Sequence, residues 1–213
     1  MVALTVLALL ILFGIAQRVL DRMHLTDRQA LVLVAAIFIG GFIPDIPLGM
    51  VSVNVGGALI PVAVCVYILI KAGTGKERAR ALIGAAVTGV AVYLLGRFMP
   101  SEPETIGFDP NYIYGIAAGV VAYLAGRSRR AAFISGVLGV LFADIAVAVI
   151  NWAGGINQPL RLGGAGMLDA VVISGLIAVL LAEFMGEALE RLTTGRADSE
   201  FEDGAIAGGR RRK

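Results

Sequence analysis

The run Ala131-Ala-Phe-Ile-Ser-Gly-Val-Leu-Gly-Val-Leu-Phe-Ala-Asp-Ile-Ala-Val-Ala-Val-Ile150 contains twenty residues, of which only Asp144 is charged. A helix needs about 20 mostly apolar residues to cross the hydrocarbon of a bilayer. The run therefore predicts a membrane-spanning helix. A charged residue inside such a helix is costly to bury, which makes Asp144 a candidate functional residue.

The composition of the whole chain supports a membrane protein. Of its 213 residues, 58% are hydrophobic and only 16% are charged. A water-soluble globule cannot cover its surface with so little charge, which argues against a soluble enzyme, a nucleic-acid binder or a disordered chain. The 28 glycines suit helices that approach closely in lipid.

Further apolar runs predict an all-α, polytopic bundle of about seven membrane-spanning helices in a single domain of residues 1–192. No basic residues precede the first run, so we interpret it as a retained helix and not as a signal peptide. The polar segment 193–213 is predicted to be a disordered cytoplasmic tail. The predicted spans are Val2–Ala16, Ala30–Ile43, Gly57–Ile70, Ala81–Gly96, Tyr112–Gly126, Ala131–Ile150 and Leu168–Met185.

The basic residues lie on alternate connections between these spans. Sixteen of the eighteen Lys and Arg residues fall on one side, and only Arg97 and Arg161 fall on the other. The positive-inside rule then predicts an external N-terminus and a cytoplasmic C-terminus, as in a multi-pass protein of the inner membrane. We expect the lipid bilayer to be the partner of these basic residues. Their contact with lipid headgroups explains the excess of positive charge, and no nucleic acid is needed to explain it.

Three features of the chain leave their structural role open. The segment 42–57 is apolar but contains two prolines, and it is either a broken helix or a re-entrant stretch. Gly115 and Gly119 have the spacing of a helix-packing motif, which would serve a homodimer or internal packing. The sequence Ile-Ser-Gly occurs at 134–136 and again at 173–175, which is either an inverted repeat of the transporter kind or a consequence of helix packing.

The residue inventory excludes several kinds of chemistry. The only histidine is His24, in a predicted cytoplasmic connection, and no lysine lies inside a predicted span. A zinc protease helix, a histidine-based serine hydrolase and a retinal Schiff base are therefore excluded. We predict no metal and no cofactor.

Carboxylates remain as the candidate functional groups. Asp144 lies in the sixth predicted span, and Asp169 opens the seventh after a glycine-rich stretch. The helical rise places the two residues roughly 9 and 10 Å from the outer surface, so they could face each other. We predict Asp144 and Asp169 as catalytic residues. The candidate substrate-binding residues are Asp45, Asn54, Asn151, Gly163, Gly164 and Gly166.

Three interpretations of the two aspartates stay open. A carboxylate pair that shares a proton would serve a hydrolase acting on a membrane peptide. The same carboxylates would serve a transporter that binds a cation or a proton-coupled solute. In a purely structural interpretation, Asp169 caps the N-terminus of a helix and Asp144 bonds to Asn151 or to a loop amide.

The hydrolase interpretation is supported by a partial resemblance. The last third of the chain is similar to intramembrane aspartyl proteases of the presenilin and prepilin-peptidase kind, which place one Asp in a span and a second in a Gly-x-Gly-Asp turn. Here Gly164-Ala-Gly166 is followed by Met167 and Leu168, so Asp169 comes two residues later than in that motif.

A second resemblance covers most of the chain. Three stretches resemble an uncharacterised bacterial and archaeal membrane family known as domain of unknown function 1614. The resemblance implies a prokaryotic membrane protein and no particular activity. The stretches are Asn54-Val-Gly-Gly-Ala-Leu-Ile-Pro61, Ile134-Ser-Gly-Val-Leu-Gly-Val-Leu-Phe-Ala-Asp144 and Gly163-Gly-Ala-Gly-Met-Leu-Asp169.

Overall fold

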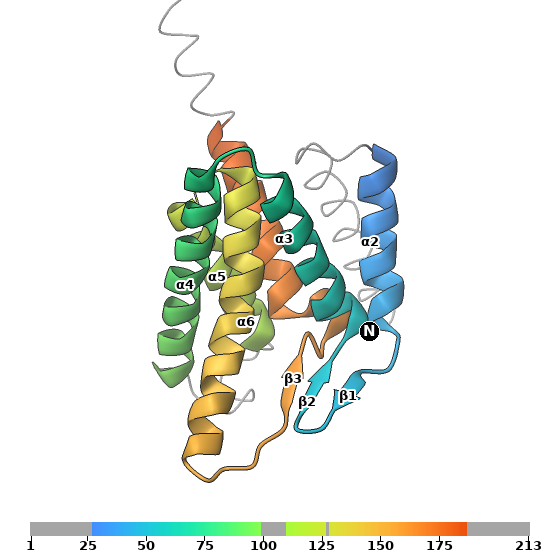
Figure 1. The fold of residues 1–213 in the computed structure, drawn as a ribbon, viewed down its shortest axis with the longest axis vertical. Coiled ribbons are helices and arrows are strands. Elements are labelled where there is room, and N and C mark those ends of the chain that lie inside the picture. Colours follow the sequence, from blue (N-terminus) through green and yellow to red (C-terminus); the bar gives the residue numbers. More distant parts are fainter. Residues whose placement is uncertain (1–26, 99–109, 127, 187–213) are drawn as a thin grey trace, which may run out of the picture.

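The described part of the chain is mostly helical, with a small sheet at one end (Figure 1). The computed structural model describes residues 27–98, 110–126 and 128–186. The first predicted span and the predicted tail lie outside these ranges. The helices are α2 (Asp27–Gly41), α3 (Ile60–Lys71), α4 (Gly75–Phe98), α5 (Pro110–Gly126), α6 (Arg129–Ala153) and a last helix at Ala170–Gly186.

Each predicted span that falls among the described residues is helical, so the all-α prediction holds for the architecture. Two of these helices, α4 and α6, are long and apolar enough to cross a membrane by length and composition. The other four apolar helices in the described ranges are shorter. The helices α4, α5 and α6 pack on one another and form the body of the bundle (Figure 1).

Local capping explains where several helices begin. The Ser128 hydroxyl accepts a hydrogen bond from the Ala131 amide at 3.2 Å and caps α6. A short π-helical turn, Val55–Leu59, precedes α3 and is capped by the side chain of Asn54. Pro61 stands in the first turn of α3, directly after the π-helical turn.

Two strands of a three-stranded sheet lie in the segment 42–57, for which the sequence predicts a broken helix or a re-entrant stretch. Strands β1 (Ile46–Leu48) and β2 (Val51–Val53) form an antiparallel hairpin. Gly49 turns the hairpin with a φ of 73°, a conformation that suits the two-residue turn. Strand β3 (Leu160–Leu162) pairs in parallel with β2, and the sheet order is β1-β2-β3. The hairpin thus replaces a helix over residues 46–53.

Small residues allow the helices to approach closely. A Cβ added at Gly115 or Gly119 would lie 2.7 or 2.6 Å from the side chains of Ile173 and Ile177, respectively. This glycine pair therefore serves internal packing of α5 on the last helix. A Cβ at Gly136 would lie 2.8 Å from the Ser174 carbonyl oxygen, so the two Ile-Ser-Gly stretches meet at a helix contact.

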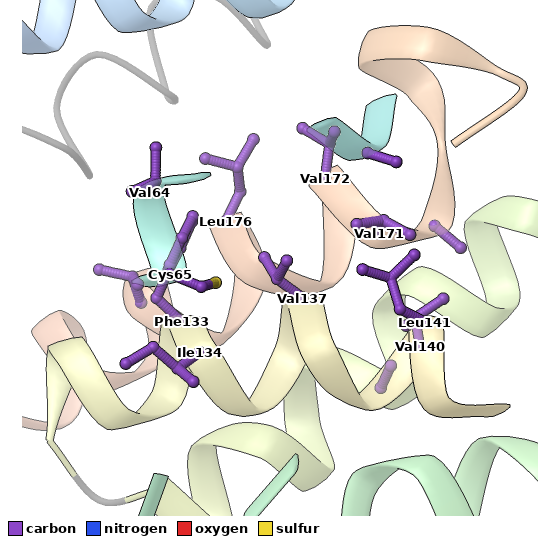
Figure 2. Packing of buried hydrophobic residues seen from close by; sticks show 14 of the residues in the cluster. Val64, Cys65, Phe133, Ile134, Val137, Val140, Leu141, Val171, Val172 and Leu176 are labelled. Carbon is purple, nitrogen blue, oxygen red and sulfur yellow. The ribbon is translucent and has the colours of Figure 1, made fainter. Parts of the chain in front are cut away.

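The core lies between α6, α3 and the last helix, as Figure 2 shows. The first two turns of α6, residues 131–137, are buried on all sides, and α3 and the last helix pack against this part of it. Val137 of α6 and Val171 of the last helix are fully buried. The labelled members are Val64, Cys65, Phe133, Ile134, Val137, Val140, Leu141, Val171, Val172 and Leu176.

The last helix runs antiparallel to α6. Arg129 at the start of α6 forms an ion pair with Glu183 near the end of the last helix, with 2.5 Å between Nε and Oε2. This arrangement brings the second half of α6 to the start of the last helix. Asp144 and Asp169 lie in those two regions.

Candidate functional site

A cavity of about 590 Å³ lies between α4, α5, α6 and the start of the last helix. Its lining contains apolar side chains such as Val92, Val140 and Val147, together with eight polar residues. Four of the polar residues are charged, namely Arg97, Asp144, Arg161 and Asp169. The uncharged polar residues are Tyr93, Tyr114, Asn151 and Gln158. The size and mixed lining are typical of a site for a small ligand.

Asp144 is half-buried on the face of α6 that lines this cavity. Within the described part of the chain, its carboxylate has no hydrogen-bond or ion-pair partner. The carboxylate of Asp144 interacts electrostatically with the carboxylate of Asp169. Asn151, predicted to share its helix face, also lines the cavity but donates from Nδ2 to Gln158 Oε1 at 3.3 Å. Asp144 is therefore presented to whatever occupies the cavity.

Asp169 is buried and caps the last helix. Its Oδ1 accepts a hydrogen bond from the Val171 amide at 3.0 Å, and its Oδ2 accepts one from the Ala165 amide at 3.1 Å. Both carboxylate oxygens are thus bound by backbone N–H groups. This is the capping arrangement that the sequence left open as the structural role of Asp169.

Asp45 and Asn54 form a polar cluster with Arg161 beside the cavity. Asn54 is almost fully buried; its Oδ1 accepts from the Gly56 and Gly57 amides, and its Nδ2 donates to Asp45 Oδ1 at 3.0 Å. Asp45 Oδ2 in turn accepts from the Arg161 guanidinium at 3.0 and 3.3 Å. Of these three residues, only Arg161 lines the cavity. We call the three residues the Asp45 clamp, because they join the hairpin, the π-helical turn and β3.

The glycines predicted as substrate-binding residues contact protein and do not line the cavity. Gly163 has a φ of 70° and lies directly against the backbone of Gly57. Gly166 has a φ of 60°, and a Cβ there would lie 3.0 Å from Gly41 Cα. A Cβ at Gly164 would lie 3.6 Å from Arg161 Cβ. The small size of Gly163 and Gly166 serves the close approach of neighbouring segments, whereas the contact at Gly164 is an ordinary one.

Sequence reasoning missed Arg97 and Arg161 as site residues, although a signal for both was present. They are the two basic residues that fall outside the one-sided charge pattern, and both line the cavity. Tyr93 and Tyr114 gave no comparable signal. No group of three or more His, Cys, Asp or Glu side chains that could hold a metal ion occurs in the described ranges.

The Asp45 clamp predicts a specific pH dependence of stability. The hydrogen bond from Asn54, and after it the one from Arg161, hold the pKa of Asp45 below its usual value of 3.8. Ionised Asp45 therefore stabilises the fold above that value, and the stabilisation is lost as the pH falls through the folded-state pKa. Asp45→Asn should unfold at a lower temperature than wild type at neutral pH, and the two should converge only below 3.8. Thermal unfolding over a pH series measures this, and convergence well above that value would contradict it.

These contacts define a helical protein with a charged cavity between its helices and a small sheet beside it. The chain belongs to the family described as "Protein of unknown function (DUF1614)", whose model matches residues 12–181. The resemblance noted on the three sequence stretches is thereby confirmed. No curated protein and no solved structure matches the chain.

Proposed function

We propose that this protein is a multi-pass membrane protein that binds a small solute in a cavity, where Asp144 contacts a positively charged group of that solute. Helix α4 supports the membrane placement, because it turns its large aliphatic side chains outward. Its buried residues are mostly small, namely Ala81, Gly84, Ala85, Thr88, Gly89 and Val92. Its exposed residues include Leu82, Ile83, Val87, Val90 and Leu94. A soluble helix has the reverse pattern, whereas a helix in lipid packs through small residues.

The position of the Asp144 carboxylate is the observation that supports the proposed binding function. This carboxylate lies in an apolar helix, faces a cavity of ligand size and is not paired within the described chain. An unpaired carboxylate in such surroundings is costly, and a nearby second carboxylate, Asp169, adds repulsion. A cation or a proton that enters the cavity removes both costs. The site is therefore suited to a cation or to a solute whose binding is coupled to a proton.

The alternative function, a hydrolase that uses Asp144 and Asp169 as a pair, has less support from the geometry. Such a pair works by exchanging a proton between its two carboxyl groups. Both oxygens of Asp169 already accept backbone N–H bonds, which fix the side chain at the start of the last helix. Asp169 is thus better suited to holding the start of its helix than to donating a proton.

Binding of n-propylammonium tests the proposed function. The purified full chain in lipid nanodiscs should bind this probe in a calorimetric titration, and the affinity should fall about tenfold or more in Asp144→Asn, since a charge-assisted hydrogen bond is lost. Binding should also weaken as the pH is lowered, because protons compete for the same carboxylate.

Glu77→Gln is the matched control for this experiment. It removes a carboxylate charge from the first turn of α4, outside the cavity lining. Its affinity for n-propylammonium should equal that of wild type. Absence of binding to the wild type, or equal binding by Asp144→Asn, would overturn the proposed function. Cleavage of a membrane peptide that is abolished in Asp144→Asn would support the hydrolase instead.

A further inference from the structure

The cavity contains two positive and two negative side chains, and two of the four are already compensated. Asp169 accepts hydrogen bonds from two backbone amides at the start of a helix, where a negative charge is favoured. Arg161 is bound by Asp45 through two nitrogens. These two charges therefore serve the protein structure.

The other two charges, Asp144 and Arg97, are available to a ligand. Asp144 comes from the middle of α6, and Arg97 comes from the last turn of α4. Across the described ranges, neither takes part in an ion pair, and they do not pair with each other. The one hydrogen bond of Arg97 there is to the Tyr93 hydroxyl at 3.5 Å. The cavity thus presents one negative and one positive charge at separate positions on its wall.

We infer that the solute is a zwitterion, with an ammonium group that binds Asp144 and a carboxylate that binds Arg97. This inference rests on the proposed function, because it takes the cation site at Asp144 as given and adds a second contact. An arginine fork suits a carboxylate, since it can donate two parallel hydrogen bonds. Opposite charges on two helices that line one cavity would also fix the direction in which such a solute binds.

The surroundings of Arg97 fit an anionic group. Tyr93 and Tyr114 line the same part of the cavity, and their hydroxyl groups can donate hydrogen bonds to a carboxylate. Gly96 precedes Arg97 and lines the cavity without a side chain. A Cβ there would be in ordinary contact with the Tyr114 hydroxyl, at 3.7 Å. The Tyr114 hydroxyl therefore lies close to the last turn of α4, which carries Arg97.

Binding of 4-aminobutanoate, compared with n-propylammonium, tests this inference. The first probe is the second with a carboxylate at its far end, so the ratio of the two affinities isolates the contribution of the anionic group. In wild type, 4-aminobutanoate should bind about tenfold more tightly or better. When the same comparison is made with shorter and longer ω-amino acids and their matching alkylammonium ions, the ratio should reach a maximum at one chain length. The reason is that the two charged side chains come from helices that are packed on each other.

The Arg97→Gln variant should bring this ratio close to one, while n-propylammonium binds somewhat more tightly because a positive charge has left the cavity. Arg80→Gln is the matched control, since it removes a positive charge from the opposite end of α4 and should keep the wild-type ratio. A ratio near one in wild type for every chain length, or an unchanged ratio in Arg97→Gln, would overturn the inference. In that case n-propylammonium would still bind through Asp144, and the proposed function would stand. If n-propylammonium failed to bind to the wild type, both the inference and the proposed function would be overturned.

Discussion

Replacing Gly57 with alanine is expected to lower the free energy of unfolding by about 3 kcal/mol, at the upper end of the range for overpacking. A Cβ at this position would overlap the carbonyl oxygen of Gly163 and would lie 2.8 Å from its Cα. Backbone atoms cannot move aside as a flexible side chain can. The backbone of Gly163 is also fixed by the pairing of β2 with β3 and by the Asn54 amide, which donates to the Leu162 carbonyl at 2.9 Å.

Thermal unfolding of the purified chain measures this effect, with Gly73→Ala as the matched control. A Cβ at Gly73 would meet no atom within 4 Å, so this variant should unfold at the wild-type temperature. If Gly57→Ala proved as stable as Gly73→Ala, the close contact between the π-helical turn and the residues after β3 would be wrong. Glycine would then have no steric advantage over alanine at position 57.

The helices could be predicted from the sequence because their signal is local. The apolar run at 131–150 has the length of a span, and the structure extends it by a few residues at each end as α6. The extension at its start follows from the Ser128 cap. In the same way, Asn54 moves the start of the helical segment to Val55 from the predicted Gly57. Capping residues thus account for the earlier starts of these two helical segments.

The sheet could not be predicted in the same way. Its strands have three residues each, which is too short for alternation to stand out in an apolar segment. The parallel partner of Ser52 is Arg161, on a distant part of the chain. The Asp45 clamp could not be predicted for the same reason, since Arg161 and Asp45 are 116 residues apart in the sequence. Contacts of this kind depend on the fold of everything in between.

The candidate site was predicted in part. Helical rise alone suggested similar depths for Asp144 and Asp169, and both line one cavity. The role of Asp169 depends on the local backbone, because the Gly-rich turn directs the Ala165 amide at its carboxylate. Arg97 was visible only as an exception to a charge pattern. Its place in the cavity follows from the packing of α4 on α6.

Asp169→Ala is expected to lower the free energy of unfolding by about 2 kcal/mol. Losing an N-cap costs about 1 kcal/mol, and loss of the part-buried hydrogen bond from the Ala165 amide adds about 1 kcal/mol. Asp169→Asn should be intermediate, because its amide keeps one oxygen for one of the two N–H groups. Ser128→Ala, which removes a cap with a single hydrogen bond, should cost only about 1 kcal/mol.

The order of these three variants in thermal unfolding separates a capping aspartate from a catalytic one. A residue needed only for chemistry would tolerate the isosteric Asn with no change in unfolding temperature, and its loss would appear in activity alone. A capping residue shows the loss in stability, and the Asn variant, with Asp144 intact, should still bind n-propylammonium. An Asp169→Asn protein as stable as wild type would contradict the cap. Asp144→Asn should show the opposite behaviour, with binding lost and the unfolding temperature equal or higher, because an unpaired carboxylate has been removed from apolar surroundings.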